Sequence, residues 1–219
     1  MRRLVGTHRF AHTQVLASEP IAQGMRMVSL LNVSGDVAQW PPLAQRCDAA
    51  VVMFEPPRMY YERERALWTP LPQQLGGLAQ WLKSAGVRTL VVVLPHAQGS
   101  LPESLKRGLA SLDEQALAEL GFERLIMVRS AQKPVALRKR HPLERLAQWM
   151  LGIFQFMVPT GEQPVRPSKI AEIVDALLQT APSGTTVLAQ EEVWTLAQLR
   201  SDDLPQALKA RFDVSGKIS

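Results

Sequence analysis

Cysteine and histidine are scarce in this chain, which has one cysteine and four histidines among 219 residues. A lone cysteine, Cys47, forms no intrachain disulfide and supplies no thiolate cluster for a structural metal ion. A chain without disulfides is typical of a reducing compartment, so we expect a cytoplasmic protein. His8 and His12 are four residues apart, but no glutamate lies between them and no third ligand is evident, so we predict no metal site.

Long apolar runs and one-signed charge blocks are also missing. The longest apolar segment, residues 146–159, is interrupted by Gln148, Gly152 and Gln155 and falls short of the roughly 20 residues that a membrane span needs. No apolar run of signal-peptide length follows the two arginines at the amino terminus. The formal net charge of +5 comes from scattered basic residues. We therefore expect a soluble protein with no transmembrane segment and no nucleic-acid partner.

Apolar strand patterns alternate with helical patterns along most of the chain. Hydrophobic residues make up 46% of the sequence, which is enough for one sizeable core in a chain of this length. Residues 48–54, 87–94 and 122–129 have the continuous apolar pattern of strands buried on both faces. Strands that alternate with helices predict an α/β fold with a doubly wound parallel sheet, helices on both faces and right-handed crossovers.

The remaining elements follow from weaker patterns. We expect strands at residues 3–6, 25–31 and 186–189, and helices at 9–17, 37–46, 73–82, 102–120, 143–157, 167–180, 193–199 and 204–212. All of them are assigned to one domain, 1–219. Residues 1–132 form a core of the nucleotide-binding type, and residues 133–219 form a small, mainly helical substrate-side region that completes the sheet.

Ligands of such sheets bind beyond the carboxyl ends of the strands. The segments expected there are residues 6–10, 54–57, 94–97 and 129–132. From these segments we select as candidate cofactor-binding residues Gly6, Thr7, His8, Arg9, Phe10, Phe54, Leu94 and Pro95.

Two segments that precede strands resemble a known family. Ala85-Gly-Val-Arg88 and Leu120-Gly-Phe-Glu-Arg-Leu125 resemble the atypical short-chain dehydrogenase/reductases, especially the small Tat-interacting-protein-like branch. The resemblance covers most of the chain and is clearest over residues 85–129. It implies a Rossmann-like fold, an NAD(P) cofactor and a catalytic tyrosine followed four residues later by a lysine.

The family's functional motifs are degenerate in this chain. An ungapped alignment places Lys106 at the tyrosine and Ala110 at the lysine, and Leu94-Pro-His96 stands where the family has serines. In the turn that begins at Gly6, Arg9 and His12 occupy the later glycine positions. Their side chains would crowd a pyrophosphate bound in the usual manner, although Arg9 can meet a phosphate by charge. The turn is therefore either a modified nucleotide site or a structural turn that has lost its ligand.

Three hypotheses about function follow. The leading one is a degenerate reductase-like protein without classical activity that binds a nucleotide such as NADP(H) or acts as a regulatory or binding protein. The first alternative is an NAD(P)-dependent oxidoreductase of altered chemistry, with His96 or Lys106 near the substrate, although His96 also fits a solvated loop residue. The second is an assembly subunit whose apolar helix 143–157 contacts a second copy or a protein partner rather than a membrane surface.

Overall fold

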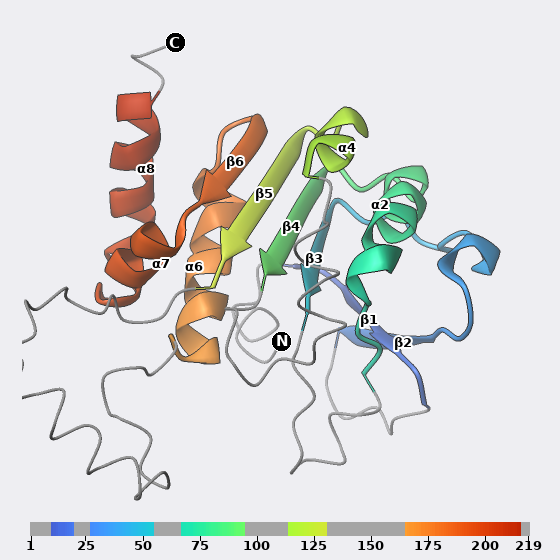
Figure 1. Cartoon of the computed structure of the whole chain (residues 1–219). Helices are drawn as coiled ribbons and strands as arrows, with labels where there is room; N and C mark the ends of the chain where they lie inside the picture. The colour runs from blue at the N-terminus through green and yellow to red at the C-terminus, as the bar shows by residue number, and fades with distance from the viewer. Residues whose placement is uncertain (1–9, 20–26, 55–66, 95–113, 131–164, 216–219) are drawn as a thin grey trace, which may run out of the picture.

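A four-stranded parallel sheet forms the centre of the protein, in the order β3-β4-β5-β6 (Figure 1). The computed structural model describes residues 10–19, 27–54, 67–94, 114–130 and 165–215. The strands of the central sheet are β3 (Ala49–Met53), β4 (Thr89–Leu94), β5 (Arg124–Arg129) and β6 (Gly184–Leu188). A parallel sheet flanked by helices is a Rossmann-like α/β architecture, so the predicted fold class is confirmed.

Both faces of this sheet are buried. Successive residues of a strand point to opposite faces, and nearly all residues of β4 and β5 are apolar, so each face presents apolar side chains to the helices that cover it. One face carries Leu90, Val92, Leu125 and Met127, and the other carries Val91, Val93, Ile126 and Val128. None of these eight side chains is more than 5% exposed. The continuous apolar runs predicted this double burial correctly.

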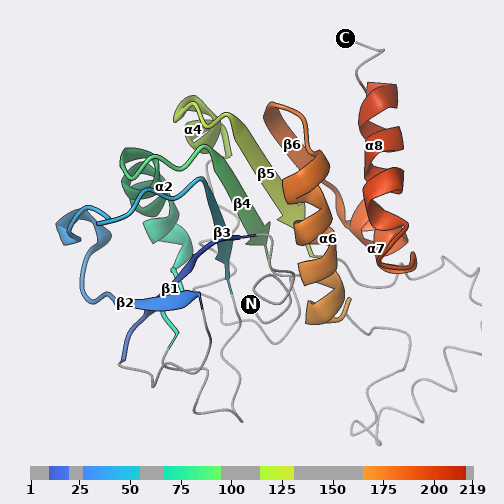
Figure 2. The same cartoon turned by 180° about the vertical axis from the view of Figure 1, so that it is seen from behind.

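Helices cover the two faces in separate groups (Figures 1 and 2). Helices α2 (Leu75–Ser84) and α4 (Glu114–Glu119) pack on the first face, where Leu78 and Leu117 join the core. Helices α6 (Pro167–Thr180), α7 (Gln190–Ala197) and α8 (Leu204–Ser215) belong to the second, where Ile173 is fully buried. Residues 165–215 thus add one strand to the sheet and cover one of its faces with helices.

The crossovers do not all have the same hand. The chain steps in one direction from β3 to β6, yet α2 and α4 lie on one face and α6 on the other. The crossover through α6 therefore has the hand opposite to those through α2 and α4, so the prediction that all crossovers are right-handed is wrong for at least one of them. The right-handed rule applies to compact strand-helix-strand units, whereas a long connection separates Arg129 from Pro167.

A second, two-stranded parallel sheet pairs β1 (Thr13–Ala17) with β2 (Val28–Asn32). The helix predicted at residues 9–17 is therefore wrong over 13–17. Thr13 and Val15 are β-branched and favour extended backbone, and Thr13 N–H donates to the carbonyl of Met27 over 2.8 Å. The helical pattern here was weak, and pairing with a strand further along the chain decided the conformation. The strand predicted at 3–6 lies outside the described residues.

Proline and glycine set several element boundaries. The helix predicted at 37–46 is reduced to the 3-10 turn η1 (Val37–Gln39), because Pro41 and Pro42 disfavour helical backbone in the residues before them. The predicted helix 73–82 appears as the 3-10 turn η3 (Pro72–Gln74) followed by α2. Gly86 and Gly121 follow the ends of α2 and α4 with φ angles of 89° and 68°, the left-handed backbone that glycine adopts at helix ends.

Candidate functional site

The carboxyl ends of the central strands, where the sequence predicts a cofactor crevice, are largely used for internal contacts. Phe54 follows β3 and is only 4% exposed, within the same core cluster as Trp40 and Val52. Its backbone N–H donates to the carbonyl of Val93 over 3.5 Å. The ring therefore packs in the core instead of facing a cofactor.

Two further contacts hold the ends of β4 and β5. The Ser130 N–H donates to the carbonyl of Leu94 over 2.9 Å, and Leu94 packs against the core cluster. The Arg129 guanidinium lies 2.8 Å from the Glu114 carboxylate. This ion pair joins the end of β5 to the start of α4 and balances the charge of an arginine that stands at the predicted crevice.

A shorter ion pair, between Arg211 and Glu192, follows the end of β6. Arg211, on α8, donates from Nε to Glu192 over 2.6 Å and from Nη2 to the carbonyl of Val187 over 3.1 Å. Glu192 also accepts from the backbone N–H of Ala189 over 2.9 Å. Burial alone would raise the pKa of Glu192, but the hydrogen bonds from Arg211 and Ala189 and the charge of Arg211 together lower it below its ordinary value.

Most of the predicted site lies outside the described residues. This holds for Gly6, Thr7, His8, Arg9, Pro95, His96 and Lys106, and for the helix predicted at 143–157. Phe54, Leu94 and Phe10 are described, and the structure separates them. Phe54 and Leu94 lie at the carboxyl edge, whereas Phe10 lines a pocket at the amino edge of the sheet.

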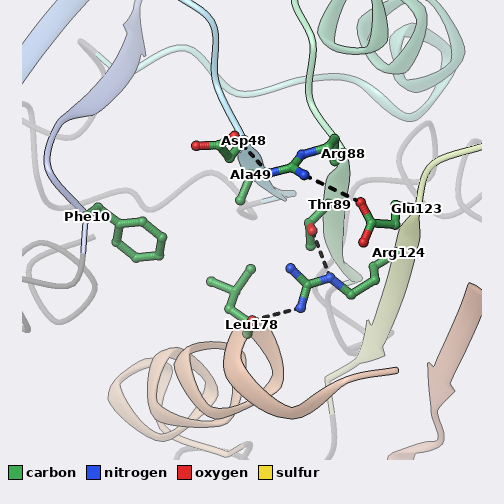
Figure 3. A pocket seen from close by; sticks show the side chains of 8 residues that line it. All are labelled: Phe10, Asp48, Ala49, Arg88, Thr89, Glu123, Arg124 and Leu178. Atoms are coloured by element: carbon green, nitrogen blue, oxygen red, sulfur yellow. Dashed lines mark hydrogen bonds and ion pairs between the residues drawn. The ribbon is translucent and has the colours of Figure 1, made fainter. Parts of the chain in front are cut away.

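That pocket has a volume of about 300 Å³ and opens among the first residues of three adjacent strands (Figure 3). The parallel register pairs Ala49 with Thr89 and Thr89 with Arg124, so these three residues form one row across the sheet. The lining consists of Phe10, Asp48, Ala49, Arg88, Thr89, Glu123, Arg124 and Leu178. Register between strands far apart in sequence brings this set together.

Arg88 and two carboxylates form an exposed network at this pocket. The Arg88 guanidinium lies 3.2 Å from Asp48 and 3.9 Å from Glu123. The three side chains are 66%, 88% and 52% exposed respectively, so each pair contributes at most about 1 kcal/mol. The positive charge of Arg88 is therefore already balanced by neighbouring carboxylates.

Arg124 has a different environment. Its Nε donates to Thr89 Oγ1 over 3.0 Å, and its Nη1 donates to the carbonyl of Leu178 over 3.1 Å. Thr89 is buried, with 1% of its surface exposed. Both acceptors are neutral, and no carboxylate of the described residues lies within ion-pair distance of this guanidinium. In Figure 3 its remaining nitrogen points toward the side of the pocket where Phe10 lies.

Arg88 and Arg124 enter the predictions from sequence only as parts of segments that precede strands, and this pocket is not among those predictions. A signal was available, because Asp48, Arg88 and Glu123-Arg124 are charged positions at the start of three apolar strands. Charged residues at strand starts are common at solvent-exposed sheet edges, however. These residues line a common pocket only because the strand register places them side by side and Leu178 on α6 lies next to them.

Comparisons with known proteins add no family assignment: no protein-family model matches the chain, and no curated protein matches it significantly. The short-chain dehydrogenase/reductase resemblance therefore remains a prediction from the sequence. Among the described residues, no helix is long and apolar enough to cross a membrane. The same residues contain no cluster of histidine, cysteine and carboxylate side chains that could hold a metal ion.

Proposed function

We propose that this chain is a Rossmann-like binding protein of the short-chain dehydrogenase/reductase type that lacks the classical reductase chemistry. In the sequence, Lys106 and Ala110 occupy the positions of the family's tyrosine and lysine. A lysine in the place of the tyrosine supplies no phenol to protonate the substrate oxygen, and an alanine supplies no charge to lower a tyrosine pKa. Function then rests on binding rather than hydride transfer.

The observation that carries this proposal is the burial of Phe54. A dinucleotide that crosses the carboxyl edge needs backbone and small or polar side chains accessible at the strand ends. Phe54 is 4% exposed at the end of β3, and Arg129 is engaged by Glu114 at the end of β5. These contacts support a binding role in which no dinucleotide lies along the carboxyl edge in the usual manner.

Calorimetric titration of the full chain with NADPH, NADH, NADP and NAD, together with a carbonyl-reduction assay, tests the proposal. We expect no NAD(P)H-dependent turnover of aldehydes or ketones. Micromolar binding of a dinucleotide that Arg9→Ala weakens would identify the ligand as a nucleotide. Robust turnover that is lost in Lys106→Ala or His96→Ala would overturn the proposal in favour of an oxidoreductase of altered chemistry.

A further inference from the structure

We propose that the pocket at the amino edge of the sheet binds a small organic monoanion, with its carboxylate on Arg124 and an apolar or aromatic ring against Phe10 and Leu178. This site goes beyond the proposed function. Ala49 and Met53 mark the two ends of β3, and they are about 13 Å apart at 3.3 Å per residue. A ligand in this pocket therefore lies away from Phe54 and Leu94, the predicted cofactor contacts at the carboxyl edge.

Arg124 supplies the binding group. A guanidinium has five N–H donors, and Arg124 uses one at Nε and one at Nη1 on the neutral oxygens of Thr89 and Leu178. These two hydrogen bonds fix the plane of the group and leave its positive charge without a carboxylate partner among the described residues. A preorganised, partly buried guanidinium of this kind favours a carboxylate, which forms short charge-assisted hydrogen bonds.

Arg88 shows why the anion is assigned to Arg124. Its guanidinium lies close to the carboxylates of Asp48 and Glu123 and is largely exposed to water. An incoming anion would have to compete with both carboxylates for Arg88, whereas at Arg124 it meets an unbalanced charge. The same two carboxylates repel a ligand with several negative charges, so they favour a monoanion over a di- or triphosphate.

The size and walls of the pocket define the rest of the ligand. A volume of about 300 Å³ lies at the lower end of the range of about 300–1,000 Å³ for small-molecule pockets, which suits one ring and not a dinucleotide. Phe10 is 37% exposed and its ring faces the pocket (Figure 3). Ala49 and Leu178 add apolar surface. A single aromatic ring with one carboxylate matches this lining.

Phenylacetate is a suitable probe, and phenylacetamide is its neutral isostere. With the full-length chain, we expect calorimetry or NMR titration to detect phenylacetate and to give an affinity for phenylacetamide at least about tenfold lower, because the charge-assisted bond is lost. Equal affinities for the two compounds, or no detectable phenylacetate binding, would overturn the proposal. This comparison uses the native protein and needs no variant.

Matched variants locate the site. Arg124→Gln should lower phenylacetate affinity at least about tenfold. Arg88→Gln removes the same charge from an exposed position and leaves Asp48 and Glu123 unbalanced, so it should lower the affinity by only about threefold. Phe10→Ala, at an exposed position, should weaken binding several-fold even if Arg124→Gln fails to fold. An affinity unchanged by Phe10→Ala, or reduced equally by Arg88→Gln and Arg124→Gln, would contradict the assignment.

Two competitors complete the test. Saturating NADPH should leave phenylacetate binding unchanged, and inorganic phosphate should not displace it. Displacement by phosphate would overturn the preference for a carboxylate monoanion, and displacement by NADPH would overturn the separation of the two sites. Failure of this proposal would appear as a loss of phenylacetate selectivity, whereas failure of the proposed function would appear as NAD(P)H-dependent carbonyl reduction. The two results are measured independently.

Discussion

The two edges of the central sheet differ in what their charged and aromatic side chains contact. At the carboxyl edge, Phe54 is in the core and Arg129 is paired with Glu114. Arg211 donates to the carbonyl of Val187 near the end of β6. At the amino edge, Arg124 is held by neutral oxygens and faces a pocket. Topology makes the carboxyl edge the usual ligand site of an α/β sheet. The pairing of side chains within the protein therefore distinguishes the two edges.

The largest expected effect comes from opening the carboxyl edge. Phe54→Ala removes a buried ring from the core cluster, and we expect it to lower the free energy of unfolding by about 3–5 kcal/mol. Phe10→Ala at the amino edge should lower it by no more than about 1 kcal/mol, because that ring is 37% exposed and belongs to neither core cluster. Urea unfolding of both variants measures the contrast. Equal losses of unfolding free energy in the two variants would show that Phe10 and Phe54 are packed to the same extent, against this account of the two edges.

The next effect distinguishes the two pocket arginines. Arg124→Gln leaves the buried Thr89 hydroxyl and the Leu178 carbonyl without their donor, so we expect a loss of about 1–3 kcal/mol in the free energy of unfolding. Arg88→Gln removes only exposed ion pairs and should cost at most about 1 kcal/mol. Chemical denaturation of the two variants under the same conditions checks this order, and a larger loss in Arg88→Gln would reverse our account of the pocket.

A smaller effect is expected at the end of β6, where pH acts on Glu192. A carboxyl whose pKa is lower in the folded protein stabilises the fold above its unfolded pKa and loses that contribution as pH falls through the folded pKa. The pKa of Glu192 is lowered from 4.5. Because 38% of this side chain is exposed, we expect Glu192→Gln to cost less than about 1 kcal/mol at neutral pH.

The difference between Glu192→Gln and wild type should shrink as the pH falls from 4.5 through the lower pKa that Glu192 has in the folded protein, below which both side chains are neutral. Melting temperatures measured across this range report the trend. Glu191→Gln is the control, because it removes an exposed charge one residue away and leaves the ion pair with Arg211 intact. A pH dependence that is the same in both variants would exclude Glu192 as its source.

The smallest effect concerns the thiol next to the pocket. Burial raises the pKa of Cys47, and the neighbouring Asp48 carboxylate raises it further. Near neutral pH the thiolate fraction is therefore small, and alkylation by iodoacetamide should be slower than in the urea-unfolded chain. Asp48→Asn should speed the reaction slightly. Since Cys47 is the only cysteine in the sequence, the rate is read directly by mass spectrometry, and a faster reaction in the folded chain would contradict this assignment.

Strong local patterns made part of the fold predictable. The apolar runs at 48–54, 87–94 and 122–129 contain β3, β4 and β5, and α6 has the predicted bounds of 167–180. Each run is long enough and apolar enough to specify burial by itself. At 13–17 the local pattern was ambiguous, and pairing with β2 made it a strand. Propensity is a weak guide where a distant partner supplies the hydrogen bonds.

The site was less predictable than the fold. The sequence predicts both Phe10 and Phe54 as cofactor contacts because each lies next to an expected strand end. The structure places Phe10 at the amino-edge pocket and Phe54 in the core. Sequence distance from a strand does not reveal whether an aromatic ring packs inward. Arg124 was passed over because its partners, Thr89 and Leu178, lie 35 and 54 residues away in sequence.

Local patterns along the chain specify a parallel α/β sheet with helices on both faces, because hydrophobic periodicity and glycine helix ends act over a few neighbouring residues. Long-range packing accounts for the rest: α6 covers the second face, residues 13–17 are extended, and Arg124 contacts Thr89 and Leu178 at the amino edge. These outcomes depend on strand register and on hydrogen bonds between distant segments. Such contacts stabilise the protein only when the sheet has formed, because folding is what brings the distant segments together.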